Sequence, residues 1–215
     1  MEIIEPDQKR RRSDWASMHD PILKSLEQYW QTLRRTQQIP ARTDLQPTKI
    51  DQVLSYTFIV HRVAPGTARF RVAGQKIHEL LKMDARGMPL TTLFHPQARG
   101  QIQDYVELAF AEPAIIALPL VSDGSLLRPT LNGTMLLLPM HDYYGQSNRL
   151  LGALVTDPQN SSNRPRRFVI PPDAPIRHDP LGLKLAATQL MPRDMIQTKR
   201  PDASRPALRL VVNND

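Results

Sequence analysis

The sequence predicts an α+β domain, with a five-stranded antiparallel sheet and helices on one face of it. Short β-branched and aromatic runs separated by turn residues occur in the order strand, strand, helix, helix, strand, strand, strand. The last three runs follow one another through short connections, which favours an antiparallel sheet over strand–helix–strand units. We also expect an amphipathic helix before the sheet and a disordered C-terminal tail after it.

The N-terminal part divides into a flexible basic segment and a helix. Residues 1–19 lack hydrophobic periodicity and contain the run Lys9-Arg10-Arg11-Arg12, so we expect no fixed structure there. A flanking helix is predicted over residues 20–36, because Asp-Pro at its start combines a good N-cap with a favourable first helical residue. Its apolar stripe has helical spacing and comprises Leu23, Leu26, Trp30 and Leu33. The stripe either covers the sheet of its own domain or pairs with its copy in a homodimer.

A hairpin is predicted next, over residues 56–73, with Pro65-Gly66 as its turn. In the second strand Phe70 and Val72 alternate with arginines, so both apolar side chains are expected on the buried face.

Two helices follow the hairpin. Ile77, Leu80 and Leu81 fall at i, i+3 and i+4, the spacing of a short helix that lies on a core. A longer helix begins at His95-Pro96 and ends at residue 112, because a proline comes next and disfavours a helical residue before it.

Three strands complete the sheet, and we place them at residues 115–121, 128–140 and 150–156. Asp123-Gly124 indicates a hairpin between the first two. The loop between the last two contains His141-Asp142-Tyr143-Tyr144, residue types found in catalytic sites. A hairpin loop without further motif context does not support catalysis.

The composition changes at residue 158. Nine of the 20 prolines lie in residues 158–215, which have Phe168 as their only aromatic residue. Such a segment buries too little apolar area to offset the entropy of ordering, so a Pro-rich basic tail is predicted. Near its end, residues 207–212 resemble a short strand. Its alternating residues are candidates for pairing with a sheet edge, with a frayed end as the alternative: Leu208, Leu210 and Val212.

Composition and charge exclude several classes of protein. The chain has no cysteine, which excludes disulfides and thiolate chemistry. No apolar run approaches the ~20 residues that span a membrane, and the start lacks a signal peptide, so we expect a cytoplasmic protein. The six histidines are scattered and no catalytic motif occurs, so neither a metal site nor an enzyme is predicted. The net charge of +7 suits contact with acidic surfaces or nucleic acid, although it also serves solubility.

The run Asp84-x-x-Gly87-x-x-Leu90-x-x-Leu93, followed by His95-Pro96, resembles the first half of a PAS domain. Together with Arg-Phe-Arg-Val-Ala-Gly at 69–74, the stretch 41–47 and the C-terminal Arg-Pro-x-Leu-Arg-Leu-Val-Val, it resembles a family of single-domain bacterial PAS-like proteins, the PAS_5 type, once catalogued only as a domain of unknown function. The resemblance covers residues 20–157 and the last few residues. It implies a PAS fold and a sensory or scaffolding role, without a known ligand.

A PAS domain holds small molecules in the hollow between its sheet and helices. The apolar residues expected to line that hollow are Phe70, Val72, Ile77, Leu80, Leu81, Leu93, Ile102, Val106 and Leu137. The same residues form a dry core if their side chains fill the space, and the sequence does not decide between the two.

The main functional hypothesis is a stand-alone sensory or regulatory module that acts by protein–protein interaction in bacterial signalling. One alternative is a sensor of haem or a small apolar molecule, with His78 of the short helix as the candidate haem ligand, although a structural role fits that histidine better. A second alternative is nucleic-acid binding through the basic segments. The scarcity of aromatic residues, 6% in all, argues against it.

Overall fold

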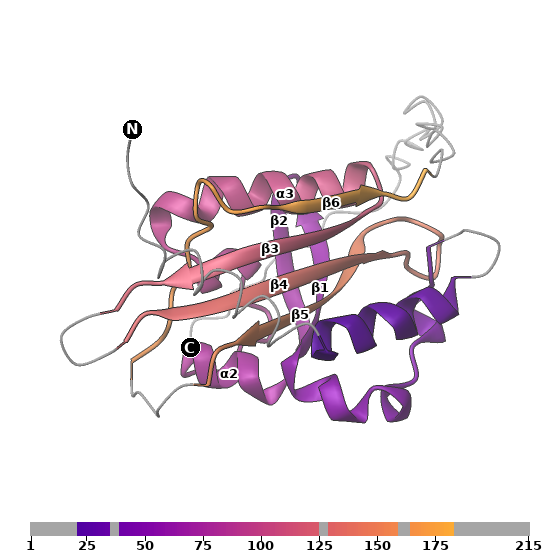
Figure 1. The fold of residues 1–215 in the computed structure, drawn as a ribbon. Helices are drawn as coiled ribbons and strands as arrows, with labels where there is room; N and C mark the ends of the chain where they lie inside the picture. The colour runs from indigo at the N-terminus through magenta and orange to yellow at the C-terminus, as the bar shows by residue number, and fades with distance from the viewer. Residues whose placement is uncertain (1–20, 35–38, 125–128, 159–163, 183–215) are drawn as a thin grey trace, which may run out of the picture. The chain divides into compact units, whose positions relative to one another are not determined.

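The computed structural model describes residues 21–34, 39–124, 129–158 and 164–182. These residues belong to one unit, Met1–Leu183, and the second unit, Lys184–Asp215, lies outside the described residues. Six strands form one antiparallel sheet in the order β2-β1-β5-β4-β3-β6 (Figure 1). The strands are β1 Thr57–Ala64, β2 Thr67–Ala73, β3 Ala114–Ser122, β4 Leu131–Met140, β5 Arg149–Thr156 and β6 Arg177–Pro180. The predicted α+β class is therefore confirmed, with one strand more than expected.

One face of the sheet is covered by α2 (Gln75–Leu81) and α3 (Arg99–Ala111). The connection between them contains two short 3-10 helices, η4 (Leu90–Leu93) and η5 (Pro96–Ala98). Apolar residues of these elements and of five strands make the larger core of the domain. The predicted short and long helices are thus present where their apolar spacing placed them.

The opposite face is covered by the leading helix, residues 21–33, and by three 3-10 helices, η1 (Arg42–Asp44), η2 (Pro47–Lys49) and η3 (Asp51–Tyr56). Leu26 and Trp30 are fully buried in a second core with side chains from β3, β4 and β5. The Trp30 indole Nε1–H donates to the Pro139 carbonyl of β4 at 3.1 Å. Helices therefore lie on both faces, and the leading helix covers the sheet of its own chain.

The sequence places the loose tail from residue 158, but residues 164–182 pack against the domain. Phe168 and Ile170 are buried in the larger core, and the Phe168 N–H donates to the Leu93 carbonyl at 2.8 Å. The chain then forms β6, which pairs with β3 (Figure 1). Proline is disfavoured in a central strand but tolerated in an edge strand such as β6. The main-chain groups of β6 find their hydrogen-bond partners at the otherwise open edge of β3. The predicted terminal strand at 207–212 lies outside the described residues.

Candidate functional site

Eight of the nine residues predicted to line a hollow come together in the larger core, between the sheet and the helices α2 and α3. Each of them is buried and packs within one cluster: Phe70, Ile77, Leu80, Leu81, Leu93, Ile102, Val106 and Leu137. Helical and strand spacing place these side chains on the same side of the sheet.

Val72 is the exception, since it lies on the other face of the sheet and is 46% exposed. Ile59 of β1 pairs with Val72, but the next residue, Val60, pairs with Phe70, so Arg71 is an extra residue in β2. Such a β-bulge shifts the alternation of the strand by one position. The prediction that Val72 faces the interior is therefore wrong, because it assumed an unbroken period of two.

The middle of the interior is filled by Phe58 of β1. Its ring packs edge-to-face on Phe70, with 5.4 Å between the ring centroids. Phe58 lies directly opposite Gly152 of β5, and a Cβ atom added to that glycine would meet the Phe58 ring. The absence of a side chain at Gly152 thus leaves room for the ring. This geometry favours a packed core over a ligand chamber at this position.

His78, the candidate haem ligand, is held by main-chain groups at both ring nitrogens. The N–H of Ala85 donates to Nδ1 at 3.1 Å, and Nε2 lies 3.0 Å from the Ala73 carbonyl, to which it donates. Both bonds are satisfied by the tautomer that carries its proton on Nε2. The side chain thereby ties the loop after α2 to the end of β2. A haem iron would have to replace one of these two bonds, so the geometry speaks against axial ligation.

The interaction candidates on the leading helix are mostly occupied by the protein's own sheet. Leu23, Leu26 and Trp30 are buried there, whereas Leu33 is half-buried. In this arrangement the stripe is not exposed for pairing with a second copy. The other predicted interaction residues, Leu208, Leu210 and Val212, lie outside the described residues.

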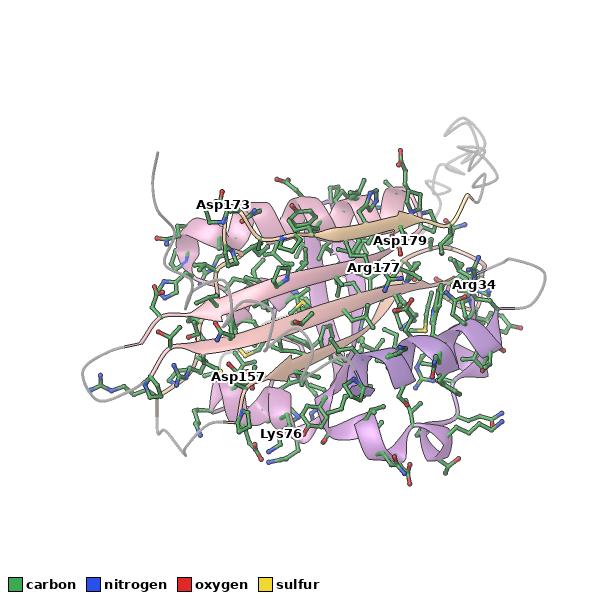
Figure 2. All side chains as sticks on the ribbon, viewed as in Figure 1. Arg34, Lys76, Asp157, Asp173, Arg177 and Asp179 are labelled. Atoms are coloured by element: carbon green, nitrogen blue, oxygen red, sulfur yellow. The ribbon has the colours of Figure 1, made fainter. Side chains whose placement is uncertain are left out.

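An ion-pair clamp, made of Arg177, Glu27 and Asp179, connects the leading helix to β6. The Arg177 guanidinium donates through both Nη atoms to the Glu27 carboxylate, at 2.7 and 2.8 Å. Its Nε donates to Asp179 at 2.6 Å, and Figure 2 shows Arg177 and Asp179 together on β6. Hydrogen bonding to Glu27, the largest cause, raises the pKa of Arg177. Sequence reasoning missed this clamp because its partners are 150 positions apart and neither stands in a motif.

The β4–β5 loop presents two exposed tyrosines on a hydrogen-bonded turn. Asp142 accepts from the N–H groups of Tyr144 and Gln146 at 2.8 and 3.0 Å, and from the Asn148 amide at 2.6 Å. Burial raises the pKa of Asp142, but these hydrogen bonds outweigh it and lower the pKa overall. Tyr143 and Tyr144 are 87% and 83% exposed and pack edge-to-face. The Asp142 carboxylate thus shapes the loop.

The described part of the chain shows two further absences. It contains no group of three or more histidine, aspartate or glutamate side chains placed to hold a metal ion. Among its helices, none has both the length and the apolar character needed to cross a membrane.

Comparison with known proteins points to one family. A family model described as "PAS domain" matches residues 18–155. Among solved structures, the chain is similar to one titled "Structure of an RNA-binding Light-Oxygen-Voltage Receptor", with 15% sequence identity and a TM-score of 0.38. That match covers 56% of this chain and 34% of the receptor chain, so the likeness spans about a third of the receptor's length. A search of curated proteins finds no match.

Proposed function

The chain belongs to the PAS domain family, and from this premise we propose that it is a sensory or regulatory module that acts by binding a protein partner in a bacterial signalling pathway. The proposal gives the domain no catalytic role. It assigns the function to the outer surface of the domain, because the Phe58 ring packs over Gly152 in the interior.

The observation that carries the proposal is the contrast between the interior and the β4–β5 loop. In the interior, the Phe58 ring fills the space over Gly152, and both ring nitrogens of the half-buried His78 are held by main-chain groups. On the surface, Tyr143 and Tyr144 are largely exposed on a hydrogen-bonded loop, and tyrosine is enriched at protein-binding sites. Their rings add little to the stability of the domain, so binding is the role that best accounts for them.

Native mass spectrometry of the protein purified from its source bacterium tests this proposal. The expected result is a complex with a second polypeptide, which is lost when Tyr143 and Tyr144 are both replaced by serine. The control is the Lys24→Gln variant, which changes an exposed residue of the leading helix. A small molecule retained at one equivalent per chain, with no polypeptide partner, would instead support the ligand-sensor alternative.

A further inference from the structure

Part of one sheet face is left uncovered next to the tyrosine loop. The leading helix packs on residues of β3, β4 and β5, including Ile115, Leu138 and Leu151. The residues that β2 presents on the same face are exposed, among them Arg69 and the bulged Arg71. The sheet therefore continues beyond the leading helix as a surface of β1 and β2.

This surface is rich in arginine. His61 of β1 lies directly opposite Arg69 of β2 and Arg149 of β5, so the three side chains form a row across three strands. With neighbouring strands ~4.8 Å apart, the row spans about 10 Å. Arg71 joins it, because its Nη2 donates to His61 Nδ1 at 3.3 Å. We call Arg69, Arg71, Arg149 and His61 the arginine patch.

The positive charge of the arginine patch is not neutralised by ion pairs. Within the described residues, no carboxylate forms a salt bridge with Arg69, Arg71 or Arg149. Partial burial, followed by the charges of Arg149 and Arg71, lowers the pKa of His61, and the charge of Asp142 only partly opposes this. The carboxylate of Asp142 is already engaged by the turn of its own loop. The patch thus keeps an excess of positive charge.

In the part of the chain that the structure describes, two buried hydrogen-bond donors at and just before the start of β5 have no partner. Nε of Arg149 and the hydroxyl of the half-buried Ser147 are buried atoms without a hydrogen bond in the described part of the chain. Buried donors of this kind are costly unless an acceptor reaches them. A carboxylate bound at the patch is an acceptor of the appropriate charge for both.

The tyrosine pair lies in the loop that leads directly into Arg149 of the arginine patch. Tyr143 follows Asp142 directly, and the charge of Asp142 is close enough to affect the pKa of His61. Tyrosine and arginine are the residues most enriched at the energetic centres of protein interfaces. The aromatic rings, the exposed Val72 and the arginines therefore combine apolar contact with positive charge on one part of the molecule.

We propose that the arginine patch and the Tyr143–Tyr144 pair form the docking surface for an acidic segment of a protein partner. Carboxylates of the segment bind the arginines of the patch, and its apolar side chains pack on the tyrosines. The inference rests on the proposed function and names the chemistry of the partner. A protein segment fits better than single-stranded nucleic acid, because the two rings pack against each other and offer no series of stacking platforms.

Fluorescence anisotropy with the full-length protein tests the inference. The probe is a short fluorescein-labelled peptide of alternating glutamate and leucine, compared with the same peptide carrying glutamine in place of glutamate and with labelled oligo(dT). We expect the glutamate peptide to bind most tightly. Replacing Arg69 and Arg71 by glutamine should weaken binding on the order of tenfold, as should replacing both tyrosines by serine. The matched control, Arg99→Gln, removes an exposed arginine at the start of α3 and should bind like the wild type.

Several results would overturn the inference. One is equal affinity for the glutamate and glutamine peptides, another is unchanged binding in the arginine variant, and a third is tighter binding of oligo(dT). Circular dichroism checks that the variants fold, and all these substitutions are at exposed positions. A partner complex that survives the arginine substitutions in native mass spectrometry would refute the acidic docking surface while leaving the proposed function intact. Specific binding of the acidic peptide without any native partner complex would refute the proposed function and leave the acidic docking surface intact.

Discussion

Replacing Gly152 by alanine is expected to destabilise the domain, because the new Cβ would lie 3.0 Å from Cε1 of Phe58 and nearer still to Cζ and Cε2. Phe58 is 1% exposed and packs on Phe70, so its ring has no free space to move into. Overpacking of this kind costs up to about 3 kcal/mol. Alanine also reduces the conformational entropy of the unfolded chain, which stabilises the folded state by about 0.5–1 kcal/mol. The net effect is a loss of roughly 2 kcal/mol in the free energy of unfolding.

Thermal and urea unfolding followed by circular dichroism measure this loss. For a domain of this size, 2 kcal/mol corresponds to a Tm lower by about 4–8 °C. Gly100→Ala is the matched control, because a Cβ at this position of α3 meets no atom within 4 Å and alanine favours the helix. We expect that variant to be as stable as the wild type or slightly more so.

The double variant Phe58→Leu/Gly152→Ala separates the contact from a general effect of the substitution. With the ring removed, the cost of Gly152→Ala should be smaller than in the wild type, which gives a measurable interaction energy between the two sites. If Gly152→Ala behaves like Gly100→Ala, or if its cost is the same with and without the ring, Phe58 does not fill the interior as described here.

Three further predictions concern the clamp, the histidine and the tyrosine loop. Arg177→Gln breaks the pair with Glu27, but both side chains are partly exposed, so we expect a loss of no more than about 1 kcal/mol in urea unfolding, and a smaller one at high salt. Hydrogen exchange in the leading helix should become faster, and unchanged protection would contradict the clamp. His78→Ala removes two bonds to main-chain groups and should cost about 1–3 kcal/mol. A Soret band that requires His78 after addition of haem would refute the structural role given to it. Asp142→Asn should destabilise the protein at neutral pH. Because folding lowers the pKa of Asp142, the wild type's advantage is expected to be complete above about pH 4 and to decrease as the pH falls through the folded pKa. An advantage that is independent of pH between neutral and strongly acidic buffer would argue against this assignment.

Much of the fold could be predicted because the relevant patterns are local. Leu23, Leu26 and Trp30 of the leading helix and the triplet Ile77, Leu80 and Leu81 repeat at helical spacing, and all of them are buried as expected. Leu33, the fourth member of the stripe, is half-buried. Helical spacing depends only on neighbours along the chain, so it can be read without knowledge of the rest of the molecule.

The candidate site could be predicted less well, because it depends on which strands pair. A β-bulge in β2, opposite β1, places Val72 on the outer face of the sheet. The sequence of β2 contains no residue that predicts this bulge. The row of Arg69, His61 and Arg149 exists only because β1 lies between β2 and β5. The bonds that occupy His78 likewise come from the end of β2 and from the loop after α2.

The amino-acid sequence by itself determined the class of fold, the order of its elements and most of the side chains that enter the cores. These features follow from periodicity and turn chemistry, which act over a few residues. Only the tertiary structure decided that Phe58 packs in the interior over Gly152 and that residues 164–182 complete the domain with β6. It also decided that arginines of β2 and β5 meet around His61 of β1, near the loop of the two tyrosines. Strand register and the open edge of β3 bring these groups together, and both depend on contacts between segments that are distant in the chain.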